Sequence, residues 1–134
     1  MAASRSAATD SKANSAIIIG QAWQAAIACH RSGRLQEAED LYAAILQSDA
    51  TNAGAHHNLG VIQVDAKKFE PALTHLLTAI ELQPAEPQYW LSYLAALTTA
   101  KRWDDASAAL KWAKEHGLQG GEVDRLAATI GKRA

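Results

Sequence analysis

Residues that break helices or cross-link small folds are scarce in this sequence. It contains 3 Pro, 8 Gly and 1 Cys in 134 residues. The single cysteine excludes a disulfide within the chain and a cysteine-rich zinc site. The scarcity of Pro and Gly, together with abundant Ala, favours helices. With 49% hydrophobic residues, the chain is long and apolar enough to bury the core of one domain.

Long apolar runs and an excess of charge of one sign are also absent. A helix needs about 18 apolar residues to span a bilayer. The longest aliphatic run is Ile17–Ile19, and Asn14 and Gln21 lie too close to it for a signal-peptide core. The formal net charge is −1 and the pI is near 6.5, so we expect neither nucleic acid nor a membrane as partner. A cytoplasmic location is expected, since a reducing compartment suits the free Cys29.

The first fifteen residues are small and polar. We interpret residues 1–15 as a flexible leader before a single domain over 16–131. An organelle transit peptide is the alternative, because serine is frequent and Arg5 and Lys12 outnumber Asp10. One arginine is too few to favour that alternative.

A period of 34 residues runs through the rest of the chain. Ala38, Ala72 and Ala106 come into register when the sequence is shifted against itself. Columns of larger residues align with the same shift: Leu35, Phe69 and Trp103; Tyr42, Leu76 and Leu110; Ala22, His56 and Trp90. An Ala-rich chain can align one Ala column by chance, but not the large residues three positions before it. The predicted repeats are 19–52, 53–86 and 87–120.

Each repeat is predicted to form two helices joined by a turn. In the second repeat, Leu59, Ile62 and Ala66 share one helical face. The pattern is interrupted at 67–68, and apolar residues then resume at helical spacing: Phe69, Ala72, Leu73, Leu76 and Ile80. Pro84 follows this second stretch and ends the helix.

These units resemble the tetratricopeptide repeat (TPR) family. Its pattern places Trp, Leu, Gly and Tyr in a first helix, then Ala, an aromatic residue, Ala and Pro. The second unit matches best, at Leu59, Gly60, Phe69, Ala72, Leu76, Ala79 and Pro84. The resemblance covers about residues 19–120. It implies an all-α fold, a right-handed α-solenoid of helix-turn-helix pairs with about seven helices. It also implies that the first helices line a concave groove for a peptide or a partner helix.

Both ends of such an array need protection from solvent. Residues 117–121 are predicted to form a loop, and about 122–131 a capping helix. Its apolar face contains Val123, Leu126, Ala127 and Ile130. At the other end we expect the first helix to begin near Ser15, with Ile17 and Ile18 extending its apolar face.

The resemblance also implies which residues face the groove. Carried over by repeat position, the candidates for partner binding are Trp23, Gln24, Ile27, His57, Asn58, Val61, Gln88, Leu91 and Ser92. An apolar strip bordered by polar side chains suits a bound peptide or helix. For Trp23 the alternative is a packing role, under the leader or against Ile19.

Two TPR subclasses make specific demands on these positions. Chaperone-clamp domains hold a C-terminal carboxylate with Lys, Asn and Arg at places occupied here by Trp23, Ile27, Asn58, Gln88 and Ser92. Only Asn58 agrees, and without the cations we do not expect heat-shock chaperone tails as partners. The TPR arm of O-linked N-acetylglucosamine transferases uses a ladder of Asn residues. Asn58 fits that ladder, whereas Gln24 and Ser92 depart from it.

No motif indicates catalysis, a cofactor or a metal. His56 and His57 are neighbours about 100° apart on a helix, so they cannot chelate one ion from one face. Cys29 is expected to be a small buried hydrophobe. The remaining histidines are interpreted as surface or helix-end residues: His30, His75 and His116. Acidic side chains of the second helices are assigned to solvent: Glu37, Glu39, Asp40, Asp104 and Asp105.

The leading hypothesis is a non-enzymatic TPR adaptor or scaffold that binds a protein segment in its groove. Two alternatives remain open. The chain can be an N-terminal recruiting or regulatory module of a larger enzyme, because bacterial TPR proteins often carry glycosyltransferase-like or methyltransferase-like domains. It can also self-associate through its end faces.

Overall fold

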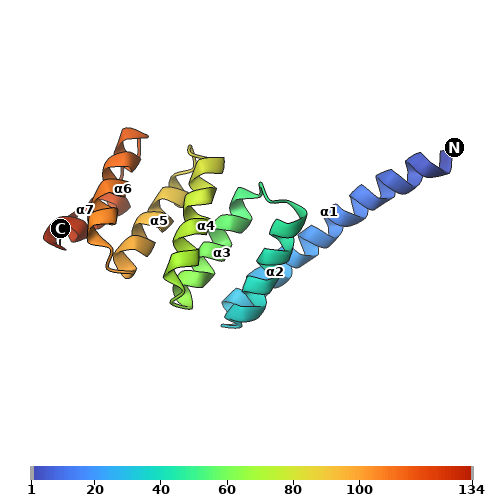
Figure 1. Ribbon diagram of the computed structural model, residues 1–134, viewed down its shortest axis with the longest axis horizontal. Coiled ribbons are helices and arrows are strands. Elements are labelled where there is room, and N and C mark those ends of the chain that lie inside the picture. Colours follow the sequence, from blue (N-terminus) through green and yellow to red (C-terminus); the bar gives the residue numbers. More distant parts are fainter. Residues whose placement is uncertain (1, 134) are drawn as a thin grey trace.

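The computed structural model describes residues 2–133, with side chains described from residue 14 onward. This part of the chain forms seven α-helices and no strand, so the expected all-α class is confirmed. The helices are α1 (Ala2–Arg31), α2 (Leu35–Ser48), α3 (Ala53–Asp65), α4 (Phe69–Leu82), α5 (Pro87–Thr99), α6 (Trp103–Glu115) and α7 (Gly121–Arg133). They follow one another in a single row from α1 to α7 (Figure 1). Among the described residues, no helix combines the length and apolarity that a membrane span requires.

The first helix begins earlier than expected. It starts at Ala2 instead of near Ser15, because the segment before Gly20 is rich in Ala and contains neither Gly nor Pro. Its first half extends beyond the other helices (Figure 1). The expected packing of Ile17 and Ile18 is wrong, since they are 57% and 62% exposed. The flexibility of residues 1–15 stays a prediction.

The turn inside each helix pair has the same backbone geometry. Gly33, Lys67 and Lys101 lie 34 residues apart and all have positive φ, of 78°, 61° and 60°. The next amide in each turn donates to the carbonyl five residues earlier: Arg34 to Cys29 at 2.9 Å, Lys68 to Gln63 at 2.7 Å and Arg102 to Leu97 at 2.9 Å. This is the Schellman ending of a helix, and it reverses the chain at the interruption seen in the sequence.

Small residues allow the helices of a pair to pack closely, as predicted. Ala38, Ala72 and Ala106 are all fully buried. A Cβ atom added to Gly60 would lie 2.6 Å from Cγ of Leu76 and 3.1 Å from the carbonyl oxygen of Ala72. The α3–α4 contact therefore has no space for a larger side chain at position 60.

Large side chains fill the space between neighbouring pairs. Trp90 is 2% exposed, and its indole N–H donates to the carbonyl of Pro84 at 2.8 Å. Its ring meets Trp112 edge-on, with centroids 4.5 Å apart. At the end of the row, Val123 and Ile130 of α7 are buried against the same core, which is the role expected of a capping helix.

The two faces of the row differ in how tightly its helices pack. Beyond the contacts between successive helices, α3 packs on α5 and α5 packs on α7. No comparable packing joins α2 to α4, or α4 to α6, within the described chain. The face formed by α3, α5 and α7 is therefore the concave one, and we call it the groove face. We call the opposite face, formed by α2, α4 and α6, the outer face.

Candidate functional site: the concave groove

Two hollows follow one another along the groove face. The first, of about 160 Å³, lies between α3 and α5 and is lined by Val61, Val64, Asp65, Leu76, Ser92, Ala95, Ala96 and Thr99. The second, of about 380 Å³, lies between α5 and α7 and is lined by Gln88, Leu91, Ser92, Ala95, Glu122, Arg125, Leu126 and Thr129. Both hollows combine aliphatic and polar walls.

The contribution of α7 to the second hollow was missed from the sequence, although a signal was present. Gln88, Leu91, Ser92 and Ala95 of α5 line this hollow. A shift of 34 residues leads from them to the four lining residues of α7: Glu122, Arg125, Leu126 and Thr129. The capping helix therefore repeats the groove positions of a first helix, and extending the period by one unit would have identified them.

A chain of side-chain hydrogen bonds crosses the groove from α5 to α2. The Gln88 amide N–H donates to Oγ of Ser92 at 3.3 Å. Oγ of Ser92 lies 2.7 Å from Nε2 of His57. Nδ1 of His57 lies 3.0 Å from Oδ1 of Asn58, whose amide N–H donates to the Tyr42 hydroxyl at 3.1 Å.

The donors and acceptors in this chain fit a neutral His57. Because Oδ1 of Asn58 only accepts, Nδ1 of His57 carries the proton and Nε2 accepts from Ser92. Burial lowers the pKa of His57, although the hydrogen bond to Asn58 and the charge of Glu86 act in the opposite direction. The His57 ring also stacks on Tyr89, with centroids 4.8 Å apart. The chain of hydrogen bonds holds these groove side chains in fixed orientations.

Trp23 of α1 packs against residues of α2 and α3. It is half-buried and meets Tyr42 edge-on, with ring centroids 5.3 Å apart. Its Cη2 atom lies 3.1 Å from where a Cβ of Gly54 would be. Trp23 therefore has a packing role, with Tyr42 and Gly54 as contacts, while its packing under the leader or against Ile19 stays a prediction.

The nine predicted groove residues differ in exposure and in which hollow they line. Gln24 and Gln88 are exposed, and the other seven are half-buried: Trp23, Ile27, His57, Asn58, Val61, Leu91 and Ser92. Val61 and Ser92 line the first hollow, and Gln88, Leu91 and Ser92 line the second. The three residues of α1 line neither of them.

A hydrogen bond joins α1 to α3 at the far ends of both helices. Nε2 of His30 lies 2.9 Å from Oδ2 of Asp65, with both side chains partly exposed. His30 was expected to be a plain helix-end residue, and it instead bridges two repeats. Within the described residues, no group of three His, Cys, Asp or Glu side chains is placed to hold a metal ion.

The geometry defines a stacked array of helix pairs with a groove along its first helices. The family model named "Tetratricopeptide repeat" matches residues 30–97, half of the chain. The chain belongs to the tetratricopeptide repeat family.

Relatives and solved structures agree with this assignment. A tetratricopeptide repeat-containing protein of Caenorhabditis elegans, trd-1, is 45% identical over 49 residues, which are 37% of this chain and 6% of that protein. The TPR2B domain of yeast Sti1, solved as a pHsp70 complex, superposes with a TM-score of 0.79 at 16% identity, over 88% of this chain and 99% of that one. The O-GlcNAc transferase of Thermobaculum terrenum superposes with a TM-score of 0.68 at 25% identity, over 77% of this chain and 20% of that one. The predicted right-handed TPR solenoid is confirmed by these matches. The chain spans only a small part of the worm protein and of the transferase.

Proposed function

We propose that this chain is a protein-interaction module that holds a peptide or helix of a partner protein in its groove. The observation that carries the proposal is the pair of adjacent hollows along α3, α5 and α7. Aliphatic side chains such as Val61 and Leu91 offer contacts to apolar side chains of the partner. The polar groups of Asn58, Gln88 and Ser92 offer hydrogen bonds to its backbone.

We propose that the partner is not held by a C-terminal carboxylate, although the Sti1 domain of similar fold was solved as an Hsp70 complex. Of the positions that a carboxylate clamp needs, only Asn58 carries a matching residue. An internal segment of the partner therefore fits this groove better than a chain end does.

We propose that binding alone, without catalysis, is the activity of this chain, and that it acts in the cytoplasm. A recruiting module for a larger enzyme is the second candidate. It is favoured by the likeness to an O-GlcNAc transferase of which this chain covers 20%. Both candidates use the same groove, and they differ in whether a catalytic domain belongs to the same polypeptide.

The proposal is tested by blocking both hollows with one substitution. Ala95 is exposed and lines both hollows, so Ala95→Trp fills them without entering the core. Ala44→Trp, at an exposed position of α2 on the outer face, is the matched control. We expect peptides selected from a display library on the wild-type protein to lose binding to Ala95→Trp and to keep it with Ala44→Trp. Equal binding to both variants would refute the groove as the site.

A further inference from the structure

The outer face carries two clefts that occupy equivalent places in successive repeats. The first, of about 360 Å³, lies between α2 and α4 and is lined by Glu39, Asp40, Ala43, Leu46, Gln47, Leu59, Gln63 and His75. We call it the acidic cleft. The second, of about 370 Å³, lies between α4 and α6 and has Leu73, Leu77, Tyr93, Leu97 and Trp112 among its lining residues. Glu70, Arg102 and Asp105 also line it, and we call it the apolar cleft after its leucine and aromatic walls.

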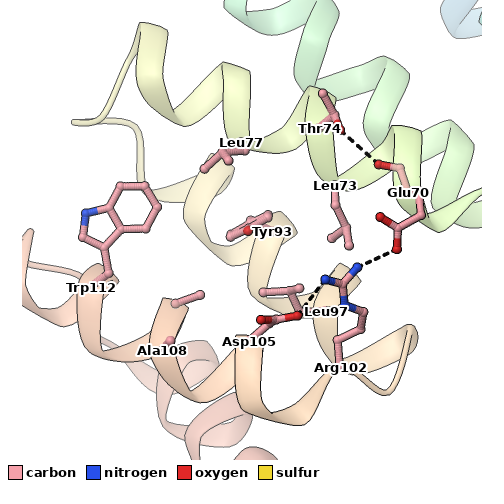
Figure 2. A pocket seen from close by; sticks show the side chains of 11 residues that line it. Glu70, Leu73, Thr74, Leu77, Tyr93, Leu97, Arg102, Asp105, Ala108 and Trp112 are labelled. Carbon is pink, nitrogen blue, oxygen red and sulfur yellow. Dashed lines mark hydrogen bonds and ion pairs between the residues drawn. The ribbon is translucent and has the colours of Figure 1, made fainter.

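Figure 2 shows the apolar cleft, with the chain's own guanidinium group at one end. Arg102 lies between two carboxylates there. It donates to Glu70 of α4 at 2.6 Å and to Asp105 of α6 at 2.8 Å. The walls beside this ion pair are formed by leucine and aromatic side chains.

At four equivalent positions the acidic cleft has polar residues and the apolar cleft has Leu, Ala or Thr. A shift of 34 residues relates Leu73 to Glu39, Thr74 to Asp40, Leu97 to Gln63 and Ala109 to His75. The two clefts have the same backbone framework, so packing alone does not require these polar groups. The presence of these polar residues therefore needs a cause other than packing.

Gln63 forms part of this cleft and lacks one hydrogen bond. The residue is 6% exposed, and its amide N–H donates to Oε1 of Glu39 at 3.2 Å. Its Oε1 atom is buried and accepts no hydrogen bond from the described residues. An unpaired buried acceptor destabilises a fold, and Leu97 shows that the equivalent position accepts an apolar side chain. A ligand that donates a hydrogen bond would account for the glutamine.

Glu39 is not the solvated carboxylate that its place on a second helix suggested. Its side chain is only 12% exposed, and Oε2 pairs with the Lys68 ammonium group at 2.8 Å. Asp40 is exposed and accepts at Oδ1 from the amide of Gln36 at 2.9 Å. One lysine therefore accompanies two carboxylates, and the cleft keeps a negative charge.

His75 adds a second neutral acceptor. Nε2 of His56 lies 2.9 Å from the carbonyl oxygen of Ala50, so His56 is protonated at Nε2 and its Nδ1 accepts. Nδ1 of His75 lies 3.1 Å from Nδ1 of His56 and donates a hydrogen bond to it. Burial lowers the pKa of His75, with the nearby His56 acting in the same direction and the charge of Glu39 in the opposite one. A neutral His75 with its proton on Nδ1 keeps a lone pair on Nε2.

We propose that the acidic cleft binds an arginine side chain of a partner protein. The residues that line it carry acceptors on three helices: Glu39 and Asp40 on α2, Gln63 on α3 and His75 on α4. A planar guanidinium with five N–H donors can reach acceptors on several sides, whereas an ammonium group has three donors around one point. The aliphatic stem of arginine packs against Leu46 and Leu59, which line the same cleft.

The test uses N-acetyl-arginine-N-methylamide, which imitates an arginine within a chain, in a nuclear magnetic resonance titration. We expect saturable shifts of the Gln63 side-chain amide and of the His75 ring. The citrulline analogue has the same shape without the charge, and we expect it to bind at least about tenfold more weakly. Absence of saturable shifts, equal binding of the citrulline compound, or shifts confined to the groove would each overturn the proposal. Free arginine binding about tenfold more tightly than the capped compound would also overturn it, by identifying the free amino acid as the ligand.

Variants that place residues of the apolar cleft in the acidic cleft test whether the capped arginine binds there. Gln63→Leu with Asp40→Thr introduces the residues found at Leu97 and Thr74, and we expect it to weaken binding of the capped arginine at least about tenfold. Asp40→Asn alone changes an exposed side chain, so it tests the charge if the double variant does not fold, and we expect weaker binding there as well. Ala95→Trp, which blocks the groove, is expected to leave this binding unchanged. Unchanged binding in the cleft variants, or loss of binding in Ala95→Trp, would refute the acidic cleft as the arginine site. Neither result would decide whether the groove binds a partner.

Discussion

A methyl group added at Gly60 is predicted to destabilise the whole array. Position 60 lies in the middle of α3, where alanine normally stabilises a helix relative to glycine by about 1 kcal/mol. Here the new Cβ would lie 2.6 Å from Cγ of Leu76 and 3.1 Å from the carbonyl oxygen of Ala72. Neither atom is the free end of a flexible side chain, so α3 and α4 must move apart.

The size of the effect follows from these opposing contributions. Overpacking in a well-packed core costs about 1–3 kcal/mol, and a contact with the branch point of Leu76 and with backbone favours the upper end of that range. After the gain in helix propensity, we expect Gly60→Ala to lower the free energy of unfolding by about 2 kcal/mol. Leu59 and Leu76 belong to two cores, each shared by neighbouring repeats, so the loss affects the cooperative unit and not one helix.

Urea unfolding followed by circular dichroism measures this change. The matched control is Gly20→Ala in α1, where no atom lies within 4 Å of the added methyl group. We expect Gly20→Ala to be neutral or to stabilise by up to about 1 kcal/mol. The two substitutions are chemically identical, so opposite signs isolate the packing contribution. A Gly60→Ala variant as stable as the wild type would refute the close approach of α3 and α4.

Three further predictions follow from the structure. Lys67→Gly and Lys101→Gly relieve a positive φ, and each is expected to raise the free energy of unfolding by about 0.5–1 kcal/mol; a loss of stability in the same urea assay would contradict the turn geometry. Trp90→Ala removes a 2% exposed side chain and is expected to cost about 3–5 kcal/mol; an unchanged thermal midpoint would contradict its burial. His57 and His75 have pKa values lowered from 6.5 by burial, so the unfolded chain binds more protons. The stability that these two residues contribute is therefore complete above about pH 6.5 and decreases as the pH falls below it. Urea titrations at pH 7.5 and 5.5 check this, and variants with both histidines replaced should show a smaller difference; an equal difference would exclude them as the cause.

Much of the fold was predictable because its causes are local or strictly periodic. Helix pairs are visible in the spacing of apolar residues, and close packing is visible in the Ala column at 38, 72 and 106. The start of α1 was predicted wrongly near Ser15, although the Ala content of the preceding segment favours helix. The share of α7 in the groove was missed, because the period was not continued beyond the third repeat.

Contacts between polar side chains were not predictable in the same way. His57 meets Ser92 from 35 positions away, and His75 meets His56 from 19 positions away. Glu39 was assigned to solvent by its place on a second helix, but Lys68 and Gln63 both bond to it. An amphipathic pattern indicates which face of a helix is buried. It does not indicate which polar groups of two facing helices lie within 3 Å of each other.

The sequence by itself determined the repeat length, the pairing of helices and the family, because each depends on residues whose spacing along one chain is fixed. Only the tertiary structure decided how His57 is held between α2 and α5, and that Gln63 has an unpaired oxygen among the described residues. Those features depend on the distances between helices that are stacked side by side. Such distances are set by packing throughout the array, and no single segment contains them.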